Sequence, residues 1–273
     1  MCAQLKVTRG GFYASLFRPT SERSRQDVGL RAEIAGAFIR SHRLYGSPRV
    51  TRQLRYQGLV VGRRRVARLM RLDSLQGRSA RSYRRCRVGQ KAFYRRFPNT
   101  ERHVALSRPN QVWVADVTYI RVAGRWRYLA VVMDKFSRRV LGWSLAKHRD
   151  AQLTTRAALH AIRRRRPSPG LVLHSDRGIE YAAHDLGRTL ACHGLVQSMN
   201  RPHQMNDNAH MESFFHSLKS ERLYGLTFDC EADLKRELSS YLSFYNNVRL
   251  HSSLNYSSPA RFESTTLATS GVN

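Results

Sequence analysis

Apolar positions early in the chain recur with the 3.6-residue period of an α-helix and predict three short helices. Asp27 is expected to cap the first helix, which ends before Gly46. Ser47 is expected to cap the second, with Pro48 at its first position, and the third follows Gly62. The apolar positions behind this prediction are Leu30, Ile34, Ala37, Phe38, Val50, Leu54, Val66, Leu69 and Met70.

The apolar pattern changes after Gln111, where runs and alternation typical of strands begin. Three antiparallel strands followed by alternating helix and strand predict a mixed α/β sheet with helices on both faces. The predicted strands are 112–120, 125–134 and 140–145, then 171–174 and 195–199. The predicted helices are one from an Asp150 cap to Arg166, one at 184–193 and one that begins near Asn208.

The composition adds a large and unevenly placed positive charge. The 273 residues include 48 Lys+Arg and 19 Asp+Glu, a net charge of +29, so the expected partner is a polyanion such as nucleic acid. Residues 1–110 hold 26 of the Lys+Arg and only 5 of the acids. Because 41% of the residues are hydrophobic, the chain can still bury a sizeable core.

The same composition excludes other classes of protein. No apolar run approaches the roughly 18–20 residues of a membrane-spanning helix, and residues 1–10 lack the apolar centre of a signal peptide. Four widely spaced cysteines predict neither a disulfide framework nor a structural zinc site. We therefore expect a soluble, cytoplasmic protein with no targeting segment and no membrane partner.

The third predicted helix combines an apolar side with a basic one. Arg64, Arg65, Arg68 and Arg71 lie on the basic side, which favours a helix-turn-helix module that inserts this helix into the major groove. A small helical bundle with solvated arginines is the alternative. The basic stretch that follows, 76–110, is expected to lie along phosphates, and its aromatic residues to stack on bases or dock on the next domain.

Three acids after residue 110 are candidates for metal-assisted chemistry. Asp116 lies within an apolar strand, Asp176 ends a strand, and Glu212 lies in the first turns of a helix. A buried carboxylate is costly unless it is paired, and Mg²⁺ or Mn²⁺ would pair with all three if they converge. Taken singly, Asp116 can pair with a buried arginine, Asp176 can cap a turn or a helix, and Glu212 can complement a helix dipole.

Several motifs resemble the second-frame transposase of the insertion sequence 3 family of bacterial mobile elements. Thirty-five residues separate Asp176 from Glu212, the interval of the Asp, Asp, Glu triad in retroviral integrases and many transposases. The resemblance runs from about Leu30 to Glu263 and implies an RNase H-like integrase core. It also implies that Asp116, Asp176 and Glu212 are catalytic and bind two metal ions, Mg²⁺ or Mn²⁺. The motifs are WVADVTYI, LHSDRGIEY, DNAHMESFFHSLKSE and YNNVRLHSSLNYSSPARFE.

The helix around Glu212 supports this interpretation by its period. Apolar residues at i, i+3, i+4 and i+7 form a core stripe, with Glu212 and Lys219 on its flank. By resemblance to integrases, Lys219 contacts the element end, although a solvated lysine is the alternative. Arg177 and Arg201 are further candidates for DNA contact. The stripe consists of Met211, Phe214, Phe215 and Leu218.

Other residues near these acids carry weaker expectations. His174 can orient Asp176 or be a buried core histidine, and Asp207 and Asn208 are expected to cap the last helix. Residues 163–166, four arginines in succession, suit either a helix dipole or phosphates. For the C-terminal YNNVRLHSSLNYSSPARFE segment, the sequence indicates only packing on the core.

The expected function is metal-dependent cleavage at element ends followed by strand transfer of the 3′-hydroxyl to DNA. A non-catalytic DNA-binding regulator and an RNase H-type nuclease are the alternatives. The expected partners are double-stranded DNA of the terminal inverted repeats and the target, a multimer on paired ends, and the first-frame product of the element, as partner or fused. The expected domains are an extension (1–26), a helix-turn-helix module (27–75), a basic linker (76–110), the core (111–225) and a C-terminal helical segment and tail (226–273).

Overall fold

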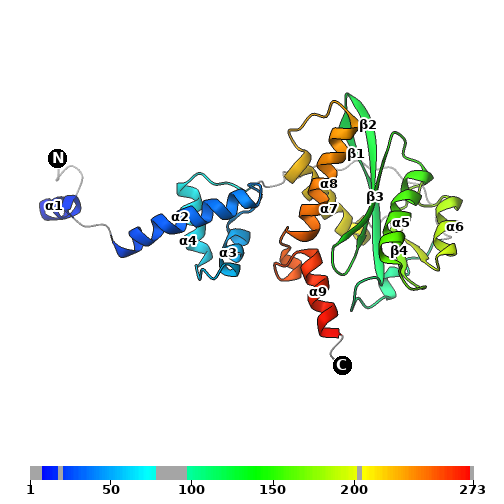
Figure 1. The fold of residues 1–273 in the computed structure, drawn as a ribbon, viewed down its shortest axis with the longest axis horizontal. Helices are drawn as coiled ribbons and strands as arrows, with labels where there is room; N and C mark the ends of the chain where they lie inside the picture. Colours follow the sequence, from blue (N-terminus) through cyan, green and yellow to red (C-terminus); the bar gives the residue numbers. More distant parts are fainter. Residues whose placement is uncertain (1–7, 18–20, 78–96, 202–204, 271–273) are drawn as a thin grey trace. The chain divides into compact units, whose positions relative to one another are not determined.

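The computed structural model describes residues 8–17, 21–77, 97–201 and 205–270. Its contacts divide the chain into two compact units, Met1–Arg78 and Ser79–Asn273. The first unit is helical, and the second contains a five-stranded sheet between helices (Figure 1). In the described part of the chain, no helix is long and apolar enough to cross a membrane. Most of the predicted basic linker lies outside the described residues, including Arg78, Arg81, Arg84, Arg85, Arg87, Lys91, Arg95 and Arg96.

The helical unit packs three helices around one apolar centre. A short helix, α1 (Arg9–Phe17), precedes α2 (Glu22–Arg40), α3 (Ser47–Tyr56) and α4 (Arg63–Leu72). The last three contact one another pairwise. The helical periods predicted from the apolar positions are confirmed, although Leu30 is only half-buried. The buried positions are Ile34, Ala37, Phe38, Val50, Leu54, Val66, Leu69 and Met70.

The predicted helix starts in this unit need correction. Helix α2 begins at Glu22 and not at residue 27, because the Ser21 hydroxyl accepts a hydrogen bond from the backbone N–H of Ser24 (3.2 Å). Asp27 lies within the helix and is buried. Similarly, Gly46 occupies the cap position of α3, and Ser47 is its first residue.

The sheet of the second unit has the strand order β3-β2-β1-β4-β5. Strands β1 (Val112–Val122), β2 (Arg125–Asp134) and β3 (Val140–Ala146) are antiparallel, and β4 (Val172–Ser175) and β5 (Val196–Met199) extend the sheet in parallel from β1. All five predicted strands are therefore confirmed to within two residues at each end. The mixed sheet follows from this chain order, since hairpins come first and helical crossovers afterwards.

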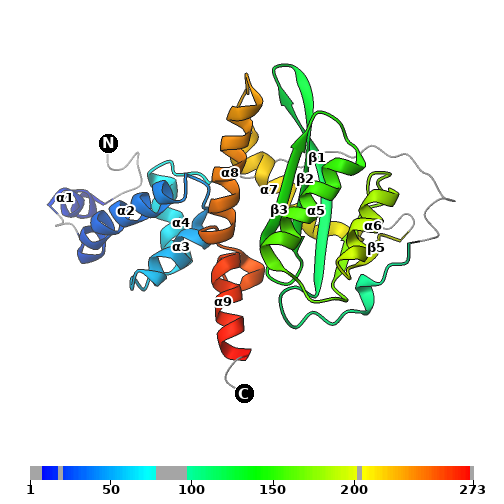
Figure 2. The same ribbon diagram turned by 45° about the vertical axis from the view of Figure 1, so that its right-hand side comes forward.

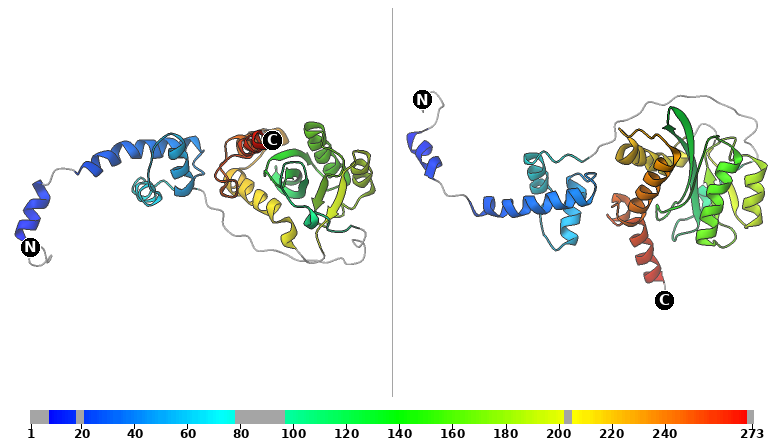
Figure 3. Two further views of the ribbon diagram at one scale, coloured as in Figure 1. Left: turned by 90° about the horizontal axis from the view of Figure 1, so that it is seen from below. Right: turned by 45° about the horizontal axis from the view of Figure 1, so that its top comes forward.

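Helices cover both faces of the sheet, as predicted (Figures 2 and 3). Helices α5 (Ala151–Arg165) and α6 (His184–Cys192) form one core with Trp113, Ala115 and Leu173. Helices α7 (Ala209–Leu218) and α8 (Glu231–Asn247) form the other with Val114 and Ile120. Gly142 lets β3 approach α5 closely, because a Cβ at this position would lie 2.3 Å from the carbonyl oxygen of Ala157.

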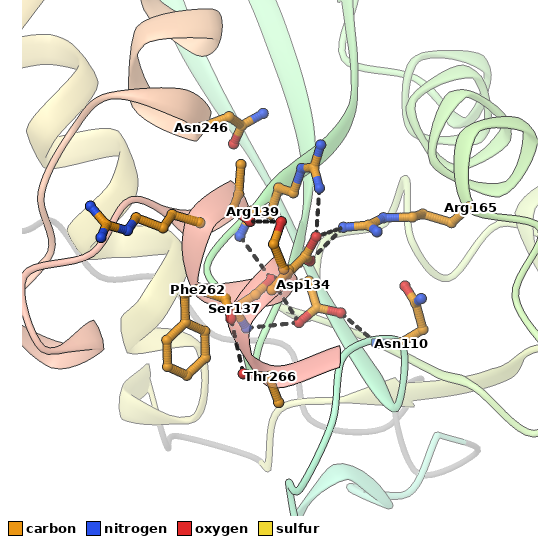
Figure 4. A network of polar contacts seen from close by, with 12 residues as sticks. Asn110, Asp134, Ser137, Arg139, Arg165, Asn246, Phe262 and Thr266 are labelled. Carbon is orange, nitrogen blue, oxygen red and sulfur yellow. Dashed lines mark hydrogen bonds and ion pairs between the residues drawn. The ribbon is translucent and has the colours of Figure 1, made fainter. Parts of the chain in front are cut away.

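The C-terminal segment is fastened to the core by a buried carboxylate. Glu263 of α9 (Pro259–Ser270) accepts hydrogen bonds from the Ser137 hydroxyl (2.7 Å) and from Arg139 Nη1 (2.6 Å). Arg165 of α5 donates to both of its oxygens at 2.5 and 2.6 Å. Figure 4 shows Ser137, Arg139 and Arg165 converging on this point. These contacts confirm that the C-terminal segment packs on the core. Arg165, one of the four successive arginines, takes part in this packing.

The link between α7 and α8 contains a second buried ion pair. A π-helical turn, η4 (Lys219–Leu223), follows α7 directly. Its Glu221 accepts hydrogen bonds from Arg249 Nε (2.8 Å) and Nη2 (2.6 Å) and from the hydroxyl of Tyr241 (2.9 Å). Arg249 belongs to the YNNVRLHSSLNYSSPARFE segment, so this segment contacts the core at two separate places.

Candidate active site

Two of the three predicted acids lie at neighbouring positions where β4 ends beside β1. The register pairs Ala115 of β1 with Ser175, the last residue of β4, and Asp116 and Asp176 are the residues that follow them. Adjacent strands lie about 4.8 Å apart, and residues in register on parallel strands share a face. The two carboxylates therefore lie side by side where β4 ends.

Burial and nearby negative charge act on both carboxylates of this pair. Burial raises the pKa of Asp116 well above its usual value, and the charge of Asp176 adds to this rise. Burial and the charge of Glu180 raise the pKa of Asp176. Hydrogen bonds from backbone N–H groups offset only part of these pKa increases. The N–H of Val117 donates to Asp116 (2.7 Å), and the N–H of Gly178 donates to Asp176 (3.0 Å).

An arginine and a third carboxylate border this acid pair. Arg149 donates through Nε to Glu180 (2.7 Å), and its Nη2 lies 3.9 Å from Asp176. Glu180 is 3% exposed, so its ion pair with Arg149 offsets part of the cost of burying this carboxylate. The hydroxyl of Tyr181 is buried beside them, where burial and the charges of Asp116 and Asp176 raise its pKa far above the ordinary value.

Glu212 is placed on the same side of the sheet as Asp116. Asn208, one helical turn before Glu212, donates through Nδ2 to the backbone oxygen of Ala115 (3.1 Å) and so ties the start of α7 to β1. Asp116 shares the face of Val114, which packs with Met211 of α7. Among the described residues, however, no group of three or more His, Cys, Asp or Glu side chains could hold a metal ion. The structure thus pairs Asp116 with Asp176, and the role of Glu212 stays a prediction.

The donor set at this position suits a divalent cation. Two adjacent carboxylates supply the hard oxygen ligands that Mg²⁺ and Mn²⁺ prefer, and a cation between them would remove their repulsion. Three buried polar atoms nearby also lack a hydrogen-bond partner within the described structure: Glu180 Oε2, the Tyr181 hydroxyl and Asn208 Oδ1. Unsatisfied oxygens of this kind are consistent with a site completed by an ion and its ligands.

Lys219 lies close to the acid pair, whereas Arg177 and Arg201 are held by the chain itself. Burial lowers the pKa of Lys219, and the nearby charge of Asp116 opposes this shift. Arg177 Nε donates to the backbone oxygen of Asn200 (2.5 Å), and Arg201 Nη2 donates to Asp207 (2.9 Å). Contact of these three side chains with DNA stays a prediction.

The expected side-chain caps of α7 are wrong. Asn208 occupies the cap position without a side-chain cap bond, because its amide is engaged by β1. Asp207 instead binds Arg201 and accepts a hydrogen bond from Asn99 Nδ2 (2.9 Å). The core stripe of α7 is confirmed, since Met211, Phe214, Phe215 and Leu218 are all buried.

His174 is a buried core histidine. It is fully buried, and its ring nitrogens bond Ser198 (2.9 Å) and Asn200 (2.8 Å). Burial lowers its pKa to about 4, so the ring is neutral at pH 7. It therefore fixes β4 against β5, next to the position where Asp176 leaves the sheet.

The predicted basic face of α4 divides into two pairs. Arg65 and Arg68 bind Asp27, with Arg65 Nε 2.7 Å from Oδ1, and these bonds hold the pKa of Asp27 below its usual value. An acid of α2 therefore neutralises part of the predicted basic face. Arg64 and Arg71 are exposed, and neither has an ion-pair partner in the described part of the chain.

Sequence reasoning missed Arg149, Glu180 and Tyr181. Glu180 and Tyr181 lie in the motif LHSDRGIEY, four and five residues after Asp176, so their proximity could have been read from the sequence. Arg149 follows β3, and only the folded sheet brings it to the acid pair. No local pattern marks such a contact, because it depends on long-range topology.

The mixed sheet with helices on both faces has the architecture of an integrase core domain. Models of an integrase core domain match residues 107–205 and 193–259, and a model of an HTH-like domain matches residues 25–83. The fold is similar to a chain of the simian T-cell lymphotropic virus intasome, solved in complex with PP2A regulatory subunit B56 gamma. That similarity has a TM-score of 0.50 at 17% identity and covers 84% of this chain and 74% of that chain.

Two curated relatives match nearly the whole chain. Transposase InsF for insertion sequence IS3A of Escherichia coli K12 is 35% identical, with 98% of this chain and 94% of the relative covered. The 31 kDa protein of insertion element IS600 from Shigella sonnei is also 35% identical, over 96% of this chain and 97% of that protein. The chain belongs to the IS3 family of insertion-sequence transposases.

Proposed function

We propose that this transposase cleaves DNA at the ends of its insertion sequence and transfers the freed 3′-hydroxyl to DNA in a metal-dependent reaction. The observation that carries the proposal is the side-by-side position of Asp116 and Asp176 on adjacent parallel strands. Carboxylates repel each other in such an arrangement, which a purely structural role does not require. The expected DNA substrates are the terminal inverted repeats and a target duplex.

In this proposal, Asp116, Asp176 and Glu212 hold one or two Mg²⁺ or Mn²⁺ ions. Bound there, the ions would stabilise negative charge on the phosphate and on the attacking and leaving oxygens. Arg149 offsets part of the negative charge of the acid pair and is itself oriented by Glu180. Lys219, on the same side as Asp116, supplies a cation for a phosphate of the bound strand.

Both chemical steps are substitutions at phosphorus. In cleavage, water attacks the phosphorus, the P–O3′ bond breaks, and a 3′-hydroxyl and a 5′-phosphate result. In strand transfer, that 3′-hydroxyl attacks a phosphodiester of the target, and a new P–O bond replaces the broken one. No protein nucleophile is needed, so no covalent protein–DNA intermediate forms.

The helical unit would bind duplex DNA through exposed arginines of α4. Arg64 and Arg71 are the side chains that remain available for phosphates or bases, whereas Arg65 and Arg68 are shared with Asp27. We expect the enzyme to work as a multimer on paired element ends. The first-frame product of the element, as a partner or fused, is the expected second protein component.

The test is a cleavage and strand-transfer assay on labelled end DNA with Mg²⁺ or Mn²⁺. Asp116→Asn, Asp176→Asn and Glu212→Gln should each abolish both products and leave DNA binding intact, whereas Asp185→Asn on the exposed surface of α6 should change neither. Full activity in any of the first three variants would remove that residue from the site. Binding without cleavage by the unmodified chain would favour a regulator, and cleavage confined to RNA–DNA hybrids would favour an RNase H-type nuclease.

A further inference from the structure

Two exposed aromatic side chains lie on the β1–β2 hairpin beyond the acid pair. Tyr119 is 50% exposed and Trp126 is 47% exposed. The register pairs Tyr119 with Tyr128 and Arg121 with Trp126, so Tyr119 and Trp126 are diagonal neighbours on one face of the hairpin. Their ring centroids are 5.0 Å apart at an interplanar angle of 84°. The hairpin therefore presents two rings to solvent as a unit.

Each of these rings is accompanied by a cation. The guanidinium carbon of Arg121 lies 5.1 Å from the ring centroid of Trp126, and Lys219 Nζ lies 4.8 Å from that of Tyr119. We name Tyr119, Arg121, Trp126 and Lys219 the hairpin platform. Exposed aromatic faces interleaved with Lys and Arg are the composition that binds unpaired nucleotides, since bases stack on the rings and phosphates meet the cations.

The hairpin platform reaches the acid pair through Lys219 at the edge of β1. Tyr119 is three residues beyond Asp116 on β1, about 10 Å along the strand at ~3.3 Å per residue, and this odd separation places the two side chains on opposite faces of the sheet. The charge of Asp116 acts on Lys219, so that side chain belongs to both places. In addition, β4 pairs with β1 only as far as Ala115, and beyond that residue it no longer covers this edge of β1.

We infer that the hairpin platform holds unpaired nucleotides of the DNA strand next to the phosphate that is cleaved. The inference rests on the proposed function, because it assigns a strand to a position beside the acid pair. Bases within a duplex stack on one another and offer no free face to Tyr119 or Trp126, whereas bases of a separated strand do.

The experiment measures binding of the full-length protein in EDTA, so that cleavage plays no part. The probes are a single-stranded dT12 with one internal 2-aminopurine and a blunt 12-base-pair duplex. Tyr119→Ala and Trp126→Ala should each weaken single-strand binding by about 5-fold to 150-fold and reduce the fluorescence change of 2-aminopurine. Tyr119→Phe and Trp126→Phe should bind as the unmodified chain does, because they keep the stacking surface.

Two controls distinguish lost stacking on the platform from misfolding and from a general loss of DNA affinity. Tyr224→Ala removes a tyrosine that is 79% exposed outside the hairpin, and it should leave both affinities unchanged. Duplex affinity of the two alanine variants should stay within about twofold of the unmodified chain, and their thermal unfolding should match it. Retention of single-strand binding in the Tyr119→Ala, Trp126→Ala double variant would overturn the inference, and so would an equal loss for both probes.

These outcomes are independent of those that test the proposed function. If the protein binds the single strand by stacking in EDTA but shows no cleavage with Mg²⁺ or Mn²⁺, the inference about the hairpin platform stands and the proposed function fails. If the double alanine variant cleaves normally and binds the single strand with unchanged affinity, the proposed function stands and the inference about the hairpin platform fails.

Discussion

Removal of one carboxylate of the acid pair should make the metal-free protein more stable. Asp116→Asn replaces a half-buried charge with a neutral group of similar shape and ends its repulsion with Asp176. The expected gain in the free energy of unfolding follows from the direction of the pKa shifts of Asp116 and Asp176. Because the pKa values of both carboxyls are raised in the folded protein, their ionisation destabilises the fold as pH rises from about 4 through the folded values.

The magnitude can be worked from the register of β1 and β4. Two unit charges about 5 Å apart repel by about 3 kcal/mol at an effective dielectric constant of about 20. The side chain of Asp176 is 36% exposed and Arg149 lies 3.9 Å from it, so solvent and this cation screen part of the repulsion. A net gain of about 1–2 kcal/mol is expected at pH 7.

Urea unfolding of the unmodified chain and of Asp116→Asn, with and without Mg²⁺, measures this gain. In EDTA the variant should be the more stable protein, and the difference should shrink as pH falls toward 4, because protonation removes the charges that repel each other. Mg²⁺ at 100 times its Kd should stabilise the unmodified chain by about 2.7 kcal/mol and the variant much less. Asp185→Asn should stay within about 0.5 kcal/mol of the unmodified chain throughout. Equal or lower stability of Asp116→Asn in EDTA would refute the reasoning.

Three further predictions concern other parts of the chain. Glu263→Ala leaves two guanidinium groups without their buried partner and should lower the free energy of unfolding by about 3–5 kcal/mol in urea; a loss below about 1 kcal/mol would show that α9 is held otherwise. Arg64→Ala and Arg71→Ala should each weaken duplex binding and lower its salt slope by about one, as measured by fluorescence anisotropy, whereas Arg65→Ala should chiefly lower the stability of the helical unit. Protonation of His174 is unfavourable in the fold, so its contribution to stability should be lost as pH falls from about 6.5 to about 4, and a His174→Gln variant should show a flatter profile over that window.

The strands and most helices could be predicted because their signals are local. Alternation and apolar runs fix β1 to β3, and Asp150 caps α5 as expected, accepting a hydrogen bond from Leu153 N (2.9 Å). Asp27 could not be placed in this way, for a physical reason. An aspartate at this position can either cap a helix or lie buried within it and bind distant arginines. The sequence does not distinguish these two roles, because the arginines that bind Asp27 follow 38 and 41 residues later.

In the candidate site, too, some residues could be predicted from the sequence and others could not. The sequence predicts Asp116 and Asp176 as a pair through their strands and the family motif, and the register then places them next to each other. The surroundings of that pair depend on residues far apart in the chain. Arg149 contacts Glu180, which lies 31 positions later in the chain, and Lys219 contacts Tyr119, which lies on β1 far earlier in the chain. No short stretch of sequence contains both partners of either contact.

The fastening of α9 sets an order of events during synthesis. Arg139 and Arg165 leave the ribosome about a hundred residues before Glu263, and until then two cations that end up mostly buried have no carboxylate to meet. A nascent chain that has not yet reached residue 263 therefore lacks the buried carboxylate that Arg139 and Arg165 share in the folded protein.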